Sequence, residues 1–137
     1  MTRVTGIGGV FFKAKDQKQL SEWYEKHLGL KPDPSGGGVL LRWREIDDPE
    51  RVGMTVWRLF KDDTKYFDPS RAPFMINYRV DDLDALLETL RAEGVEIDPR
   101  RDNHDYGRFA WIMDPEGNRI ELWEPPKNEL NVSQTGE

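Results

Sequence analysis

The chain repeats one pattern of residues after about half its length, and this repeat limits the folds that it can adopt. Apolar and less apolar residues alternate in segments 10–14 and 76–80, which lie 66 positions apart. A period of two predicts a half-buried strand in each place. Asp16 and Asp82 follow these strands, again 66 positions apart. Because aspartate accepts hydrogen bonds from the free N–H groups at a helix start, both positions predict the beginning of a helix.

Apolar residues at helical spacing follow each aspartate, which predicts a helix with one buried face. They are Leu20, Trp23, Tyr24 and Leu28 in the first copy and Leu83, Leu86, Leu87 and Leu90 in the second. Gly29 and Gly94 are expected to end the helices, because glycine takes the left-handed conformation at the lowest cost. Short strands are expected at about 30–34, 37–43 and 54–60, and again at 95–98, 106–113 and 118–124. Each half therefore predicts the order β-α-β-β-β.

The length of 137 residues suits a single domain. We expect this domain to cover residues 1–126, with one module at about 5–61, a linker at 62–72 and a second module at about 73–126. Residues 127–137 are polar and show no pattern, so we expect a mobile tail.

The composition excludes several classes of protein. A formal charge of −6, without a cluster of lysines and arginines, argues against a nucleic-acid partner. The lack of cysteine excludes disulfides, thiolate metal ligands and cysteine nucleophiles. No apolar run approaches the ~18 residues that a membrane span needs, so no membrane partner is expected. These observations favour a soluble, cytoplasmic protein.

The duplicated order resembles the vicinal oxygen chelate superfamily, and the segment 114–125, DPEGNRIELWEP, carries the closing motif of that resemblance. The superfamily includes glyoxalase I, bleomycin-resistance proteins and extradiol dioxygenases. The resemblance covers roughly residues 5–126. It implies an α+β fold, in which two tandem β-α-β-β-β modules form curled mixed half-barrel sheets around a cleft. It also implies a possible homodimer.

The resemblance further implies a site for a divalent metal ion, but this sequence departs from the ligand pattern. Metal-dependent members use a histidine, sometimes a glutamine, early in the first strand of each module, and these positions fall on Gly9 and Met75. Some members add a glutamate where this chain has Trp57. Only Glu121 matches its expected ligand. One carboxylate does not make a tight site for such ions, so we predict no cofactor, with a divalent metal at Glu121 as the alternative.

Strand alternation predicts which side chains face the cleft. On this basis Glu121 faces the cleft while Ile120 and Leu122 lie under a helix, and Gly9 leaves room for a planar ligand. The candidate ligand-binding residues are Phe11, Trp43, Trp57, Met75, Asn77, Arg79, His104, Trp111 and Trp123. Large aromatic side chains with a few polar groups are typical of small-molecule pockets.

Other interpretations of the same residues stay open. The tryptophans could only fill the core, and Arg79 could pair with Glu121 without any catalytic result. His104 is expected in a loop, from which it could reach the cleft or lie in solvent. His27 is expected to lie partly exposed near the end of the first helix.

The sequence therefore predicts a glyoxalase/bleomycin-resistance-like protein that binds a small, aromatic molecule in a metal-free cleft. The alternative is an enzyme of the same fold, of the lyase, isomerase or dioxygenase type. Such an enzyme would depend on a metal or would use Glu121 as its catalytic residue, a general base with a pKa raised by burial. A subunit without pocket chemistry is a third possibility.

Overall fold

This computed structural model describes residues 3–34, 36–127 and 129. Within those residues the chain forms two helices and seven strands. In chain order the elements are β1 (Gly6–Ala14), α1 (Gln17–Leu28), β2 (Val39–Arg44), β3 (Val52–Lys61), β4 (Phe74–Arg79), α2 (Leu83–Ala92), β5 (Ile97–His104), β6 (Gly107–Met113) and β7 (Arg119–Glu124).

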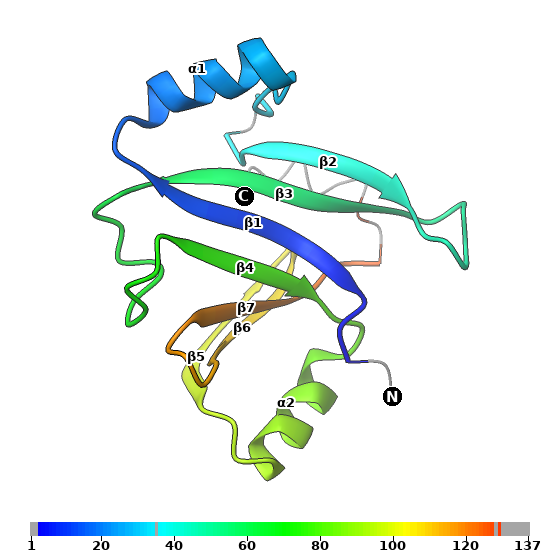
Figure 1. The fold of residues 1–137 in the computed structure, drawn as a ribbon. Coiled ribbons are helices and arrows are strands. Elements are labelled where there is room, and N and C mark those ends of the chain that lie inside the picture. The colour runs from blue at the N-terminus through cyan, green and yellow to red at the C-terminus, as the bar shows by residue number, and fades with distance from the viewer. Residues whose placement is uncertain (1–2, 35, 128, 130–137) are drawn as a thin grey trace.

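All seven strands belong to one mixed sheet with the order β2-β3-β1-β4-β7-β6-β5. The repeat is visible in the pairing, because β1 runs parallel to β3 and β4 runs parallel to β7. The antiparallel pair of β1 and β4 joins the two modules. Figure 1 shows that β7, β6 and β5 turn away from the first four strands, so the sheet curls around one face. The sheet does not close into a barrel, and the expected α+β class is confirmed.

Both helices begin as the sequence predicts. The Asp16 carboxylate accepts a hydrogen bond from the N–H of Gln19, and the Asp82 carboxylate accepts one from the N–H of Ala85. Gly29 ends α1 in the left-handed conformation with φ of 70°. Neither helix is long and apolar enough to cross a membrane.

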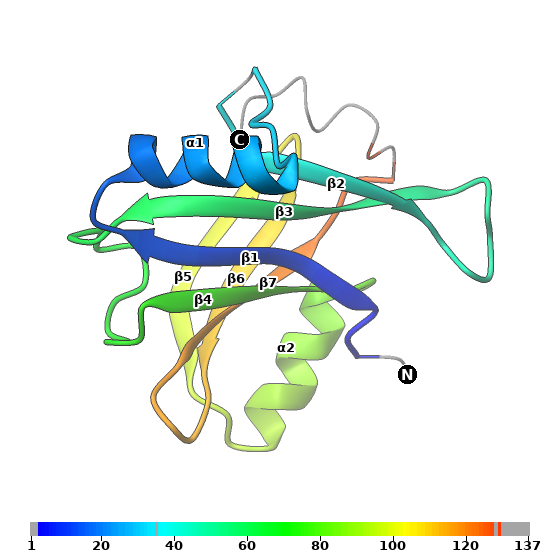
Figure 2. The same ribbon diagram turned by 45° about the horizontal axis from the view of Figure 1, so that its top comes forward.

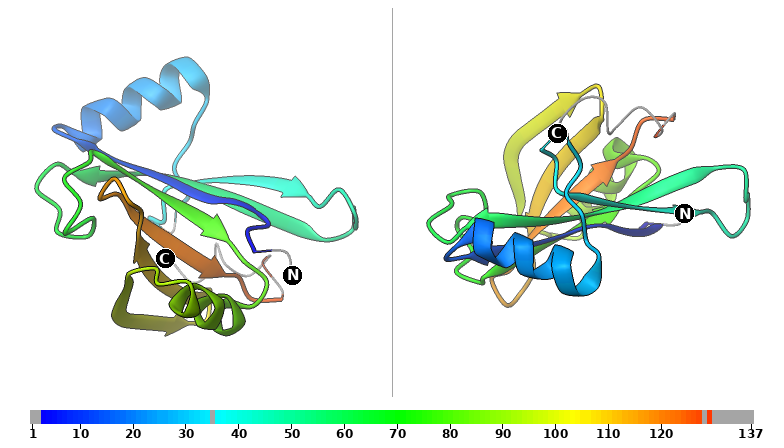
Figure 3. Two further views of the ribbon diagram at one scale, coloured as in Figure 1. Left: turned by 60° about the horizontal axis from the view of Figure 1, so that its bottom comes forward. Right: turned by 90° about the horizontal axis from the view of Figure 1, so that it is seen from above.

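The two helices lie on the same, outer face of the sheet. Residues Val10, Trp57, Ile76 and Ile120 are neighbours across successive strands and therefore point to one side. In the first module this side packs against α1 through the rings of Phe12, Trp57 and Tyr24. In the second module it packs against the buried leucines of α2. Figures 2 and 3 show that α1 and α2 lie outside the curl of the sheet. The strands of the first module lie between α1 on one side and β5 and β6 on the other.

Two expectations about strands are wrong. Residues 30–34 form no strand, because Pro32 and Pro34 have no N–H to donate to a neighbouring strand. The first module therefore has one strand fewer than the second. In contrast, β5 continues to His104, well beyond residue 98, so the segment expected to be a loop is mostly strand.

The inner face of the sheet carries a core of large apolar side chains. The buried members are Phe11, Met54, Val56, Phe67, Met75, Phe109, Trp111 and Trp123. Phe67 belongs to the segment between β3 and β4, and Tyr66 beside it packs against the same core. The linker therefore covers part of the inner face rather than merely joining the modules.

Candidate functional site

Glu121 lies at the centre of the inner face, as the alternation of β7 predicts. Its neighbours Ile120 and Leu122 pack with the α2 core on the outer face. Across the sheet, Glu121 is paired with Asn77 of β4 and with Trp111 of β6. The register therefore brings three polar side chains into one row beneath the curl.

Three donors surround the Glu121 carboxylate. Asn77 Nδ2 donates to Oε1 at 2.5 Å, and Trp111 Nε1 donates to Oε2 at 3.0 Å. The hydroxyl of Tyr66 also hydrogen-bonds Oε2. Gly8 makes room for Asn77, because a Cβ atom at residue 8 would lie 2.1 Å from Asn77 Oδ1. The carboxylate is thus held in one orientation by groups from three separate segments.

Burial and hydrogen bonding have opposite effects on the pKa of the Glu121 carboxyl group. Glu121 is only 1% exposed. Burial raises the pKa of its carboxyl group, because the charged form loses its hydration, while the hydrogen bonds from Tyr66, Asn77 and Trp111 oppose that rise. The carboxyl group is therefore a weaker acid than an exposed glutamate.

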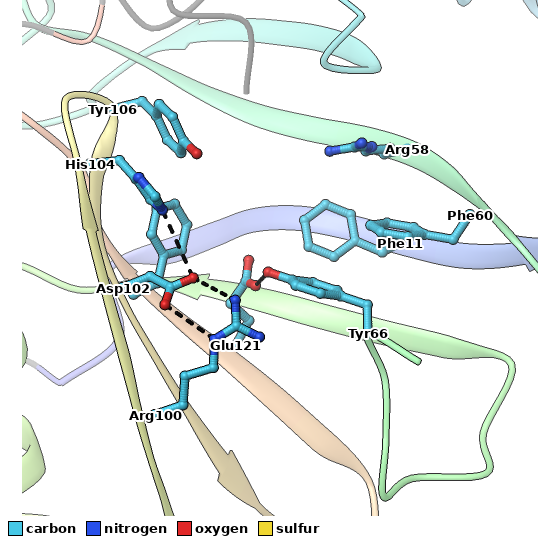
Figure 4. A pocket seen from close by; sticks show the side chains of 10 residues that line it. Phe11, Arg58, Phe60, Tyr66, Arg100, Asp102, His104, Tyr106 and Glu121 are labelled. Atoms are coloured by element: carbon cyan, nitrogen blue, oxygen red, sulfur yellow. Dashed lines mark hydrogen bonds and ion pairs between the residues drawn. The ribbon is translucent and has the colours of Figure 1, made fainter. Parts of the chain in front are cut away.

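A cavity of about 370 Å³ opens above Glu121. Its lining residues are Phe11, Arg58, Phe60, Tyr66, Arg100, Asp102, His104, Tyr106, Phe109 and Glu121. Figure 4 shows two walls. Phe11, Phe60, Arg58 and Tyr66 form one, and Tyr106, His104, Asp102 and Arg100 face them from the other. The first wall comes from β1, β3 and the linker, whereas the second comes from β5 and the turn after it.

Aromatic rings make up much of both walls. Phe60 and Tyr66 are stacked with centroids 5.5 Å apart and an interplanar angle of 7°. On the opposite wall His104 and Tyr106 are stacked at 4.8 Å and 15°. The cavity is thus bounded by a pair of stacked rings on each side.

The polar side chains of the second wall come from alternate positions of β5. Arg100 Nη2 donates to Asp102 Oδ2 at 2.8 Å, and the Arg100 guanidinium lies 4.9 Å from the centroid of a Trp111 ring. His104 Nε2 lies 3.8 Å from Asp102 Oδ2. The hydrogen bond from Arg100 lowers the pKa of the Asp102 carboxyl group. Asp102 is therefore a charged group that is already paired.

The structure brings only part of the predicted site together at this cavity. Phe11, His104 and Glu121 line it. Asn77 and Trp111 lie behind the lining, where they hold Glu121, and Met75 is fully buried in the inner core. His104 reaches the cavity from a strand and not from a loop. Gly9 leaves no open volume, because the Phe11 ring already fills the space where a Cβ atom would lie.

The expectation that Trp57 faces the cleft is wrong. The parallel register pairs Gly9 with Val56 and Val10 with Trp57. Trp57 therefore points to the outer face, where its ring lies 4.7 Å from that of Tyr24 on α1. Arg58 and Phe60 take the inner positions instead. A shift of one residue in register moves every side chain of a strand to the other face.

Arg79 and Trp43 form a separate cluster, away from the cavity lining. The Arg79 guanidinium lies 4.7 Å from the Trp43 ring and 5.2 Å from the Trp123 ring. It forms two hydrogen bonds with the Glu129 carboxylate and donates to the Met54 carbonyl. The suggested pairing of Arg79 with Glu121 is wrong, because the C-terminal segment supplies its acid.

The residues present do not fit the divalent metal of the metal-dependent members. Gly9 and Met75 supply no hard ligand, and both Glu121 oxygens already accept hydrogen bonds from neighbouring donors. Among residues 3–34, 36–127 and 129, no three histidine, aspartate or glutamate side chains cluster to hold an ion. Glu121 is instead held by hydrogen bonds from protein side chains, which occupy the oxygens that a metal ion would need.

Several lining residues were missed by the sequence reasoning. Placing Trp57 in the cleft turns its neighbour Arg58, and with it Phe60, to the outer face. The alternation of Arg100, Asp102 and His104 becomes visible only when β5 is extended past residue 98. Tyr66 lies outside the sheet, in the linker, so no periodic pattern could have placed it beside Glu121.

A sheet of two repeated modules that curls over a buried carboxylate defines a general class of proteins. In this class the cleft lies between the two repeated halves. The model of the Glyoxalase/Bleomycin resistance protein/Dioxygenase superfamily matches residues 6–122. This chain belongs to that superfamily, and the resemblance seen in the repeat is confirmed. Comparison with curated proteins gave no match.

Solved structures with a similar fold differ in their described activities. Methylmalonyl-CoA epimerase from Mycobacterium tuberculosis has 22% identity and a TM-score of 0.56, with 92% of this chain and 91% of that chain covered. The Streptomyces coelicolor epimerase in complex with 2-nitronate-propionyl-CoA has 18% identity and a TM-score of 0.64, covering 89% and 98%. NAD-dependent benzaldehyde dehydrogenase from Legionella pneumophila has 15% identity and a TM-score of 0.56, covering 86% and 98%. At these identities the likeness shows the fold alone.

Proposed function

We propose that the protein binds a small, planar aromatic molecule in the cavity above Glu121, without the divalent ion of the metal-dependent members. The observation that carries this proposal is the pair of ring stacks on opposite walls, Phe60 with Tyr66 and His104 with Tyr106. The volume of about 370 Å³ falls within the range of ligand pockets, roughly 300–1,000 Å³. A flat ring between the walls would gain contacts with faces or edges of both stacks.

Calorimetric titration with planar aromatic compounds, each matched by a saturated ring compound of similar size, tests this proposal. We expect saturable binding of the aromatic members. Tyr106→Leu should lose affinity by roughly two- to tenfold, since an aromatic pair contributes about 0.5–1.5 kcal/mol beyond its buried area. Trp23→Leu is the matched control, because Trp23 is half exposed on α1 and far from the lining. Equal affinity for the flat and saturated compounds would contradict the proposal.

A second function, an enzyme with Glu121 as general base, is favoured by a separate observation. The carboxyl group borders the cavity and burial raises its pKa, which suits proton abstraction from a carbon acid. The epimerases of the same fold among the solved structures support this alternative. The base would need to be ionised and released from Tyr66 before it could accept a proton.

Exchange in D₂O distinguishes the two functions. If Glu121 acts as a base on a related thioester, methylmalonyl-CoA incubated with the protein exchanges its acidic C–H proton, and Glu121→Gln abolishes the exchange. The exchange rate should rise with pH through the raised pKa. Saturable binding of aromatic compounds without any exchange would leave the binding function as the better account.

A further inference from the structure

Arg58 is a charged side chain on the cavity wall that has no acidic partner among the residues that the structure describes. It belongs to β3 and lines the cavity beside Phe60, whose ring centroid lies 4.9 Å from its guanidinium carbon. Within the described part of the chain it forms no ion pair or side-chain hydrogen bond. The Phe60 ring is therefore the one partner that the described residues give to this charge.

Other arginines of the sheet strands are neutralised by carboxylates. Arg79 pairs with Glu129, Arg100 with Asp102, and Arg119 with Asp98. Arg101 and Arg108 share Asp84. In a chain with 26 acidic and 20 basic residues, carboxylates are plentiful, yet none reaches Arg58 among the residues that the structure places. On this wall, Arg58 therefore carries a positive charge that no carboxylate of the described residues neutralises.

The charges of the other lining residues do not cancel that excess. Arg100 and Asp102 neutralise each other across 2.8 Å. Both oxygens of Glu121 accept hydrogen bonds from Tyr66, Asn77 and Trp111, and this carboxyl group forms no ion pair with Arg58. Arg58 is therefore a positively charged group on the cavity wall that pairs with no carboxylate of the described residues, in a protein whose formal charge is −6.

We propose that the ligand is an aromatic carboxylate, with its ring between the two stacks and its carboxylate on the Arg58 guanidinium. This rests on the proposed binding function and adds the ligand's charge to it. A guanidinium donates two parallel hydrogen bonds to a carboxylate, and one arginine balances one negative charge. The apolar faces of Phe60 and Phe11 beside Arg58 suit the ring that carries this group.

Matched pairs of ligands test the charge separately from the shape. Each acid, from benzoate to 2-naphthoate, is titrated beside its neutral amide, which keeps the ring and size. We expect wild-type protein to bind at least one acid about tenfold or more tightly than its amide. Arg58→Gln should reduce this ratio to near one without weakening amide binding, and Arg58→Lys should keep part of the preference. Arg71→Gln, an exposed arginine outside the lining, is the matched control and should keep the full ratio.

The outcomes separate this inference from the function on which it rests. Equal binding of acids and amides, or a preference that survives in Arg58→Gln, would overturn the assignment of the anion to Arg58 and leave aromatic binding standing. Failure of every acid and amide to bind would count against the proposed function and this inference together. Loss of both ligands in Arg58→Gln would show a role in cavity shape and not in charge recognition, which also overturns the inference.

Discussion

Glu121 shows at the scale of one residue how burial and hydrogen bonding set the state of a carboxyl group. Three donors fix its oxygens, while desolvation disfavours its charge. Because its folded pKa lies above the unfolded one, protonated Glu121 stabilises the fold fully below the unfolded pKa, and this contribution is lost as pH rises through the folded pKa. The residue therefore makes the protein less stable toward alkaline pH.

Replacement by the neutral isostere tests that sign. We expect the free energy of unfolding of Glu121→Gln, relative to wild type, to increase by at least about 1 kcal/mol between about pH 4 and pH 8, because the amide has no charge to bury. Urea unfolding across this range measures the difference. Glu116→Gln, in the exposed turn before β7, is the control and should follow the wild-type curve. Parallel curves for Glu121→Gln and wild type would show that burial does not raise this pKa.

The Arg79–Glu129 pair gives a second prediction for single residues. Both side chains are almost fully buried, at 4% and 2% exposure. Removing one partner leaves an unpaired buried charge, so Glu129→Ala should destabilise the protein by roughly 3–5 kcal/mol in chemical denaturation. Glu93→Ala breaks an exposed arginine–glutamate pair, that of Arg3 and Glu93, and should change stability little. Similar small effects in both variants would mean that the buried pair with Glu129 does not stabilise the fold.

At the scale of elements, the sequence predicted the parts whose signals are local and failed where the signal is shared between segments. Asp16 and Asp82 marked the helix starts because capping depends on neighbours in sequence. Trp57 was assigned to the wrong face because the register of β3 is set by pairing with β1, which the sequence of β3 does not contain. The strand expected at 30–34 failed for a local reason that was available, since two prolines lie within it.

The linker between β3 and β4 is the element whose role the sequence least revealed. It was assigned as a polar connection, yet Phe67 is fully buried in the inner core and Tyr66 holds Glu121. Phe67→Ala should therefore destabilise the protein by about 3–5 kcal/mol, as measured by urea unfolding. Phe74→Ala, on the exposed side of nearby β4, is the matched control and should have a much smaller effect. A small loss in Phe67→Ala would show that the linker is not part of the core.

At the scale of the whole molecule, the repeat predicted the order of the modules, and the inward direction of Glu121 followed from the alternation of β7. The cavity could not be predicted in the same way, because its walls come from opposite modules and their spacing depends on how the sheet curls. The single domain at 1–126, with its modules at about 5–61 and 73–126 and the linker at 62–72, stays a prediction, and so does the mobile tail at 127–137. A cytoplasmic location and a homodimer also stay predictions. Because residues of both modules line one cavity, the structure is not divided there into two separate halves, as the sequence repeat alone would suggest.

Cooperative unfolding is the consequence of that construction. The antiparallel pairing of β1 with β4 joins both modules into one sheet, and the inner core contains residues from both. The halves should therefore unfold in one transition, although their sequences repeat one pattern. With the five tryptophans labelled by fluorine, their NMR signals should be lost at the same urea concentration, Trp57 in the first module together with Trp111 and Trp123 in the second. An aromatic ligand should shift all five midpoints equally, since it contacts both walls. Separate midpoints for Trp57 and Trp111 would show that each module is stable alone and that the cavity lies between two independent units.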